Sequence, residues 1–321
     1  MLTENRFTAA ANLARKLEGP DEALGQSLKK ILESDRAQGT IIGYGRILKL
    51  FDTFCQSRRD KNLSQNQLRT LFLLKKFSEG PSSSVQTATA ALNYFLGEVQ
   101  PHEASLQKAI ASAASRTKPT VQNRTKLPLE HYRRLVETAS KYPELDRAGT
   151  LAILLFNAML RISEALALRW DDVQLDKPDG EGSLQIRRSK TDQEGKGVNL
   201  PIKLEKEEFR VVTRFKLVNG AGFIFLSAST KTPITYSTAC KELKLLLHKA
   251  GLENFNYTSH AFRGGAATAA LESGVDGTEV MRAGRWKSTS AFGCYIARKP
   301  IKKSTDGEHA NLGDEDGPRK N

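Results

Sequence analysis

Apolar residues recur at three- and four-residue steps in the first third of the chain, which is the spacing of amphipathic helices. Ile41, Leu48 and Phe51 illustrate the pattern. The stretches that show it are 40–54, 67–77, 84–96 and the alanine-rich 105–115. The serines at 82–84 have side chains that cap helix N-termini, and we expect them to cap the third helix. The pattern predicts a compact bundle of four or five helices over residues 36–115.

Two segments flank this predicted bundle. Residues 1–35 are rich in Ala, Lys and Leu and are broken by Gly19-Pro20, so we expect an arm with one or two short helices. Residues 116–128, RTKPTVQNRTKLP, hold four basic residues, two prolines and no acidic residue. Such a segment buries little surface, which indicates an extended interdomain linker, with a solvated surface loop as the alternative. Beside a nucleic acid, its basic side chains would contact phosphates. They are Arg116, Lys118, Arg124 and Lys126.

A second domain is expected over residues 129–300, where helical patterns are interrupted by strand-like runs. The predicted helices are 130–141, 151–157, 235–250, 260–273 and 276–283. The strand-like runs SLQIRRSK and VNLPI stand on either side of the charged, glycine-containing TDQEGKG, which is typical of a β-hairpin. The predicted fold class is therefore mostly α with a small β-sheet or hairpin (α+β), in two domains. Residues 301–321 are polar and of mixed charge, and we expect them to be disordered.

The charge of the chain narrows the class of partner. There are 49 Lys and Arg against 36 Asp and Glu, which gives a net charge of +13 and a pI near 9.6. This excess favours a polyanion such as nucleic acid. The alternative is a basic protein whose charge only keeps it soluble.

The cysteines and the apolar runs indicate the cellular compartment in which we expect the protein. Cys55, Cys240 and Cys294 lie far apart without the spacing of a metal site, so we expect a reducing compartment and no structural zinc. No run approaches the ~18 apolar residues of a membrane span, and the N-terminus lacks the apolar stretch of a signal peptide. We therefore expect a soluble intracellular protein without a membrane partner. It would lie in the cytoplasm or nucleoid of a prokaryote or of a virus's host, or in the nucleus of a eukaryote.

Common cofactor motifs are absent from the sequence. It has no GxxxxGK[ST], GxGxxG, HExxH or EF-hand pattern, and its five histidines are scattered singly, so no metal or nucleotide cofactor is predicted. Three clusters carry candidate chemistry instead. In the first, AMLRISEALALRW at 158–170, Arg161 stands between two helical runs and Glu164 lies one turn on, so both can share a face. An ordinary surface ion pair is the alternative for these two residues.

The second cluster is TSHAFRGGAATAALESG at 258–274. Thr258 or Ser259 is predicted to cap a helix, which places His260 and Arg263 on one face of its first turns. An imidazole, a guanidinium and the positive end of a helix dipole together suit a phosphate. The small residues at 264–267 would allow close approach of backbone or of a neighbouring helix, and simple tight helix packing is the alternative.

The third cluster is AGRWKSTSAFGCYIARK at 283–299, in which Trp286 precedes Tyr295 by nine residues. Taken in order, the three clusters resemble the tyrosine recombinase (phage integrase) family, and its Cre-like members in particular. LRISEALALRW is similar to the family's first box, and SHAFRGGAATAALESG to its His-x-x-Arg box. The stretch from Trp286 to Tyr295 resembles the nucleophile segment, with Trp as in Cre-like members where most others carry His. Lys190 corresponds to the hairpin lysine of the family.

This resemblance implies that the chain cuts and rejoins DNA through a covalent 3′-phosphotyrosine on Tyr295, without metal or ATP. Arg161 and Arg263 would clamp the scissile phosphate because guanidinium forks are planar and always charged. Trp286 would donate its indole N–H to the same phosphate. His260 is the best candidate for the base that activates the tyrosine.

The two remaining roles are less closely specified by the clusters. Lys190 would protonate the departing 5′ oxygen, with Lys196 or His260 as the alternative acid. Glu164 would orient Arg161 or His260 rather than carry a proton.

The resemblance also implies an assembly. The helical core-binding domain and the catalytic domain would form a C-shaped clamp around duplex DNA. Four protomers would assemble as a tetramer on two DNA sites. Two other functions remain as alternatives: a type IB topoisomerase-like enzyme, which shares this chemistry, and a non-catalytic DNA-binding protein derived from a recombinase.

Overall fold

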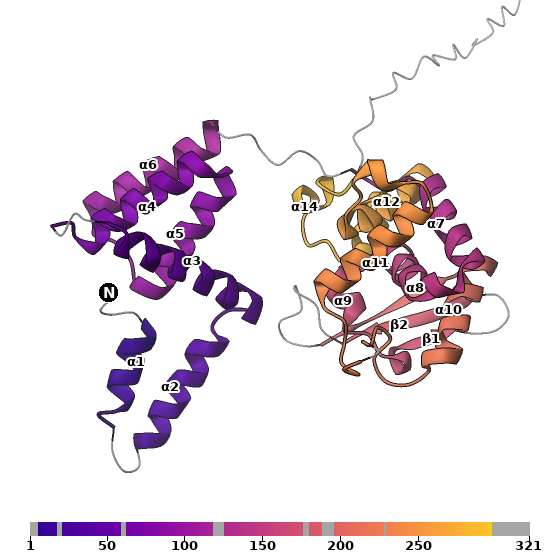
Figure 1. Ribbon diagram of the computed structural model, residues 1–321, viewed down its shortest axis with the longest axis horizontal. Helices are drawn as coiled ribbons and strands as arrows, with labels where there is room; N and C mark the ends of the chain where they lie inside the picture. Colours follow the sequence, from indigo (N-terminus) through magenta and orange to yellow (C-terminus); the bar gives the residue numbers. More distant parts are fainter. Residues whose placement is uncertain are drawn as a thin grey trace, which may run out of the picture. The chain divides into compact units, whose positions relative to one another are not determined.

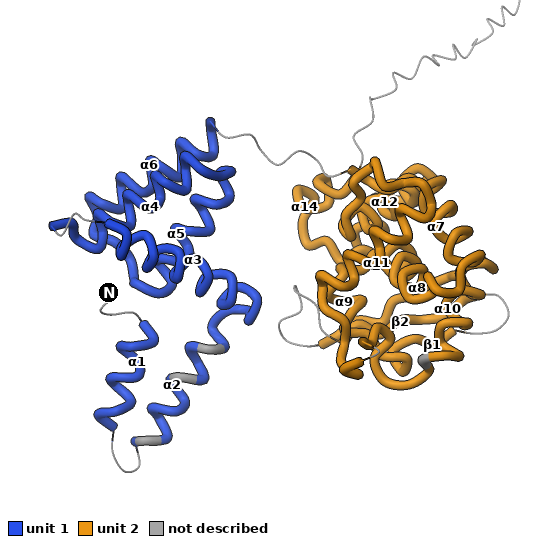
Figure 2. Tube along the Cα trace, viewed as in Figure 1, with its two compact units in different colours: residues 1–122 blue, residues 123–321 orange. Residues whose placement is uncertain are grey.

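A computed structural model describes residues 6–17, 21–58, 62–117, 125–175, 180–187, 196–227 and 229–296. The chain divides into two compact units, residues 1–122 and 123–321, which Figure 2 shows in different colours. The division between them lies within the segment 116–128. The predicted fold class is confirmed: the described residues are mostly helical, with a small antiparallel sheet.

The described part of unit 1 is helical (Figure 1). Its helices are α1 (Arg6–Ala14), α2 (Glu22–Ser34), α3 (Gln38–Gln56), α4 (Gln65–Glu79), α5 (Ser82–Leu96) and α6 (Pro101–Thr117). The last four pack around a core in which the rings of Phe51 and Phe72 meet edge to face at 5.3 Å. Apolar residues at three- and four-residue steps produce this core, because that spacing places them on one face of each helix.

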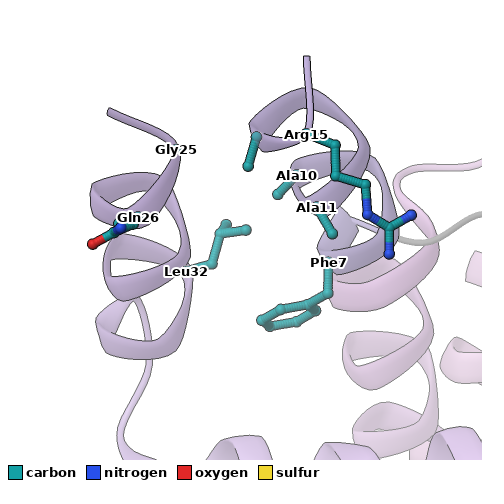
Figure 3. A pocket seen from close by; sticks show the side chains of 8 residues that line it. Phe7, Ala10, Ala11, Arg15, Gly25, Gln26 and Leu32 are labelled. Carbon is teal, nitrogen blue, oxygen red and sulfur yellow. The ribbon is translucent and has the colours of Figure 1, made fainter. Parts of the chain in front are cut away.

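Helices α1 and α2 are the two short helices expected before residue 35. They contact one another, and Gly25 allows the close approach, since a Cβ there would lie 2.9 Å from the Cβ of Ala14. A mainly apolar pocket of about 400 Å³ opens beside them (Figure 3). Its lining residues are Phe7, Ala10, Ala11, Ala14, Arg15, Gly25, Gln26 and Leu32.

Two predictions in this unit are wrong in detail. The serines at 82–84 do not cap α5: the N-cap is Pro81, and the Ser84 hydroxyl donates to the Pro81 carbonyl at 2.8 Å. Proline has a fixed φ and no N–H, so the chain can enter the helix directly after it. Helix α6 runs to Thr117, so Arg116 belongs to its last turn rather than to an extended linker.

Unit 2 is built around a buried helix, α8 (Asp146–Asn157), which contacts α7, α10, α11 and α12. The other helices are α7 (Leu129–Lys141), α9 (Ile162–Leu166), α10 (Lys206–Asn219), α11 (Tyr236–Lys249), α12 (Ser259–Glu272), α13 (Gly277–Gly284) and α14 (Thr289–Gly293). Short 3₁₀ helices η2 (Pro143–Leu145), η3 (Trp170–Asp172) and η4 (Glu253–Phe255) lie between them. Leu151, Ile153 and Leu155 of α8 are fully buried, which explains the long apolar run of that segment.

The sheet has three antiparallel strands in the order β1 (Val173–Leu175), β2 (Glu181–Ile186) and β3 (Val198–Lys203). Leu184 pairs with Leu200 and Ile186 with Val198, so β2 and β3 form the predicted hairpin. Leu184, Ile186 and Leu200 are buried, as alternation along a half-buried strand requires. The turn of this hairpin, and Lys190 with it, lies outside the described residues.

Candidate active site

Arg161 and Glu164 form a buried pair at the start of α9. The Glu164 carboxylate accepts the backbone N–H of Arg161 at 2.9 Å and the Nη1–H of the same residue at 2.6 Å. The two side chains are 18% and 2% exposed, so the surface ion pair considered above is wrong. Burial raises the pKa of Glu164, but these hydrogen bonds and the charges of Arg285 and Arg161 outweigh it, and the pKa falls below its usual value.

Arg263 lies on the first turns of α12 and is only 1% exposed. Its Nη1 donates to the Met159 carbonyl at 2.6 Å and its Nη2 to the carbonyl of Gly284. The guanidinium carbon is 4.3 Å from the centre of the Trp286 ring, a cation–π contact. Burial, and then the charges of Arg161 and Arg285, lower the pKa of Arg263 to about 10. This side chain is thus a buried cation held by main-chain oxygens and covered by an indole.

The predicted side-chain cap of α12 is wrong. Thr258 occupies the N-cap position, but its side chain makes no capping hydrogen bond, and Ser259 is the first helical residue. The turn is closed instead through the main chain, where the Ala261 N–H donates to the Thr258 carbonyl at 2.8 Å. A hydrogen bond between residues three apart pairs backbone N–H and C=O groups at a helix end without a capping side chain.

The small residues of α12 allow a neighbouring backbone segment to approach closely, as expected from the glycines and alanines at 264–267. A Cβ on Gly265 would lie 2.0 Å from the Leu127 carbonyl oxygen, and the Leu127 N–H donates to the Ala261 carbonyl at 3.0 Å. Leu127 is fully buried, so the end of the predicted linker packs against α12 within unit 2. Lys126 beside it donates from Nζ to the Cys294 carbonyl at 2.7 Å.

The candidate nucleophile follows α14. Ser288 caps this helix through its Oγ, which accepts from the Ala291 N–H at 3.2 Å. Beyond it, the phenolic oxygen of Tyr295 lies 3.1 Å from Nδ1 of His260. The rings of Tyr295 and Trp286 are 5.2 Å apart. The tyrosine is therefore within hydrogen-bond distance of the predicted base and beside the predicted indole donor.

The structure brings together most of the predicted site. Arg161, His260, Arg263, Trp286 and Tyr295 all converge in unit 2, from α9, α12 and the segments around α14. Lys190 lies outside the described residues, as do Lys118 and Arg124. Arg187, before the hairpin turn, is anchored by Asp172, whose Oδ1 accepts from Nε at 2.6 Å. Lys196, the alternative acid, is exposed and lies two residues before β3.

One residue of this site escaped the sequence interpretation. Arg285 donates to Glu164 Oε2 at 2.9 Å and completes a group of three guanidiniums, Arg161, Arg263 and Arg285, around one carboxylate. The only signal in the sequence is a basic residue directly before Trp286. That signal is weak, because basic residues are frequent in this chain.

Three buried donors in this group have no hydrogen-bond partner: Nε of Arg263, Nε of Arg285 and Nε1 of Trp286. Buried polar groups are normally satisfied, so unpaired donors beside excess positive charge are suited to an anion such as phosphate. Within the described residues, no group of three or more His, Cys, Asp or Glu side chains could hold a metal ion. In the same part of the chain, no helix is long and apolar enough to cross a membrane.

Comparison with known proteins is consistent with this geometry. The model of the phage integrase family matches residues 126–300, more than half of the chain. An integrase/recombinase xerD homolog from Selenomonas ruminantium is 25% identical over 309 residues, which cover 88% of each chain.

Solved structures share the fold. A lambda integrase dimer bound to a COC′ core site matches with a TM-score of 0.57 and 17% identity, covering 93% of this chain and 81% of that one. The Tn1549 transposon integrase in complex with transposon right end DNA matches with a TM-score of 0.55 and 15% identity, covering 85% and 94%. The family match, together with the tyrosine, histidine and arginines assembled in one site, identifies the chain as a member of the phage integrase family, the tyrosine recombinases.

Proposed function

We propose that this recombinase cuts and rejoins duplex DNA at specific sites through a covalent 3′-phosphotyrosine on Tyr295. The observation that carries the proposal is the 3.1 Å separation between the Tyr295 phenolic oxygen and His260 Nδ1. A free phenol has a pKa of about 10, so a tyrosine needs a base or a positive field to attack at neutral pH. His260 supplies the first, and the Arg263 guanidinium, 5.6 Å from the centre of the tyrosine ring, supplies the second.

Strand cleavage then follows as one in-line displacement. The phenolic oxygen of Tyr295 forms a bond to the scissile phosphorus, and its proton passes to His260. The bond from phosphorus to the 5′ oxygen breaks, and Lys190 gives that oxygen a proton. Negative charge spreads over the non-bridging oxygens in the transition state, where preorganised donors stabilise it.

Arg161, Arg263 and Trp286 are the proposed donors to that charge. The Arg263 Nε–H and the indole N–H lack protein partners, which supports their assignment to the phosphate. Rejoining reverses the step with a 5′ hydroxyl as the attacking group. Because the phosphotyrosyl bond conserves the energy of the broken bond, the reaction needs no ATP.

The assembly is also part of the proposal. The net charge of +13 supports duplex DNA as the partner. The lambda integrase structure is a dimer on a core site, and XerH, which matches with a TM-score of 0.53, is bound to a palindromic difH substrate. We extend this to two protomers on each DNA site and a tetramer on two sites. The helical unit and the catalytic unit would clamp the duplex, with the basic residues of 116–128 on its phosphates.

Covalent trapping tests the proposal. Each duplex of a random-sequence library carries a nick at one fixed position. Where cleavage falls just upstream of that nick, the short 5′-hydroxyl strand diffuses away and the adduct accumulates. The parent protein is expected to form an adduct that survives denaturing detergent, and Tyr295→Phe is expected to form none while binding DNA equally well. An adduct with the Phe variant, or none with the parent, would overturn the proposal. Duplexes recovered from the adduct then show whether two sites exchange strands, which a topoisomerase would not do.

A further inference from the structure

Arg285 occupies a backbone position that suits few residues. It is the C-cap of α13, with φ 59° and ψ 39°, the left-handed conformation in which glycine and asparagine are favoured. A residue with a Cβ is strained there, and such strain persists only where other contacts hold it.

The guanidinium of Arg285 reaches back across the site to the turn before α9. Its Nη2 donates to Glu164 Oε2 at 2.9 Å and to the Met159 carbonyl at 3.2 Å. Its Nη1 donates to the Ala283 carbonyl at 3.1 Å and lies 3.4 Å from that of Ala158. The side chain is 10% exposed. Met159 is itself left-handed, with φ 45°, so two strained residues face each other through this one side chain.

The positive charges of Arg161, Arg263 and Arg285 outnumber the single negative charge of Glu164. Glu164 accepts the Arg161 guanidinium on Oε1 and the Arg285 guanidinium on Oε2, and Oε2 also accepts the backbone N–H of Arg161. Three guanidiniums against one carboxylate leave two positive charges in excess. Without Arg285, Glu164 would neutralise one of the two remaining guanidiniums and leave a single positive charge. A phosphodiester carries one negative charge, and its displacement transition state spreads a second over the non-bridging oxygens.

We propose that Arg285 is a positioning residue that neutralises Glu164, so that the charges of Arg161 and Arg263 both remain available to the scissile phosphate. This inference rests on the proposed function. Glu164 orients Arg161 through two hydrogen bonds, and Arg285 removes the electrostatic cost of that orientation.

The competing explanation is that Arg285 only fastens two turns together. The two explanations predict different responses to a change in the charge of the substrate. We compare Arg285→Gln, which keeps polar donors and loses the charge, with the parent in single-turnover cleavage at saturating DNA. One substrate is the ordinary nicked duplex, and the other carries a methylphosphonate at the scissile position, where a neutral methyl replaces a charged oxygen. Arg282→Gln is the matched control, because it removes an exposed charge from the same helix.

The charge explanation predicts a roughly 10- to 100-fold slower cleavage of the phosphodiester by Arg285→Gln, in the range of lost electrostatic donors. On the methylphosphonate, the same variant should cleave within about threefold of the parent, because the transition state there has one negative charge fewer. Glu164→Gln in the Arg285→Gln background should recover much of the lost rate, since two unopposed guanidiniums are restored. Arg282→Gln should cleave both substrates like the parent.

Equal losses on the two substrates, with no recovery in the double variant, would overturn the inference and leave Arg285 as a structural fastener. Parent-like cleavage of the phosphodiester by Arg285→Gln would overturn it as well. Thermal unfolding of each variant separates a folding defect from a charge effect. Failure of the parent to form any Tyr295 adduct would instead refute the proposed function itself, so the two failures are distinguishable.

Discussion

Gly284→Ala tests the packing that holds the indole in the site. A Cβ at this position would lie 1.7 Å from Cζ3 and 2.2 Å from Cε3 of Trp286. Carbon atoms in contact are about 3.5–4.0 Å apart, so the indole must move by roughly 2 Å. It has little room to do so. Trp286 is 8% exposed, and its ring centre lies 5.1 Å from that of Phe292, 5.2 Å from that of Tyr295 and 4.3 Å from Cζ of Arg263.

The size of the effect follows from this overlap. Forcing extra atoms into a packed core costs about 1–3 kcal/mol. For a domain of this size, each kcal/mol lowers the melting temperature by about 2–4 °C, so we expect a decrease of roughly 2–12 °C. Displacing a group by about 1 Å from its productive place can cost about 100-fold in rate. We therefore expect adduct formation to fall by roughly 10- to 100-fold, with DNA affinity little changed.

Three measurements check this prediction: thermal unfolding, single-turnover adduct formation, and tryptophan emission in a Trp170→Phe background, which leaves Trp286 as the only indole. A shift of the emission to longer wavelength is expected as the indole leaves its buried site. Gly293→Ala is the matched control, because no atom lies within 4 Å of its Cβ position. Parent-like stability and parent-like cleavage in Gly284→Ala would show that close packing of Gly284 against Trp286 does not hold the indole in the site.

The other predictions concern the remaining parts of the site and the linker. Arg161→Lys should slow adduct formation by about 100-fold or more at unchanged DNA affinity, because an ammonium cannot replace the fork that meets both Glu164 and phosphate. Parent-like rates there would remove Arg161 from the phosphate site. Lys190→Ala should slow cleavage by roughly 10²–10⁴, yet cleave nearly as fast as the parent when sulfur replaces the bridging 5′ oxygen, since a thiolate leaves without a proton. Slow cleavage of both substrates would move the acid to Lys196 or His260. Joint neutralisation of four linker residues should weaken binding to all sequences and reduce the slope of log affinity against log salt by up to about 4, whereas an unchanged slope would take the linker off the DNA. The four are Arg116, Lys118, Arg124 and Lys126.

The sequence predicts helices well in this chain because their apolar residues face one core at helical spacing. Prediction from the sequence fails where contacts with residues far away in the chain determine which segments are buried. Strand β1 has three residues, Val173–Leu175, which are too few to show alternation, and it is held by pairing with β2. Helix α10 was missed although Val211, Val212 and Phe215 are buried in it. The residue before it is Glu205, which is not among the side chains preferred at an N-cap.

In the site too, the residues that local sequence specifies could be predicted, and those that depend on distant contacts could not. Cluster order and residue types identify Tyr295, His260 and Arg263, because the chemistry of phosphate constrains which side chains can serve. Sequence could not predict that Lys126 donates to the Cys294 carbonyl, since the two are brought together only by the packing of Leu127 on α12. Nor could it predict Arg285, whose role depends on a left-handed backbone and on Glu164, far away in the sequence.

Mapping the residue that becomes attached to DNA tests directly whether Tyr295 is the nucleophile. The trapped adduct is digested with nuclease and trypsin, and the modified peptide is sequenced by mass spectrometry. Cleavage after Lys287 and Arg298 yields the peptide 288–298, in which Tyr295 is the only tyrosine. We predict a nucleotide joined through its 3′ phosphate to the phenolic oxygen of Tyr295. Attachment at any other residue, or through a 5′ phosphate, would contradict it.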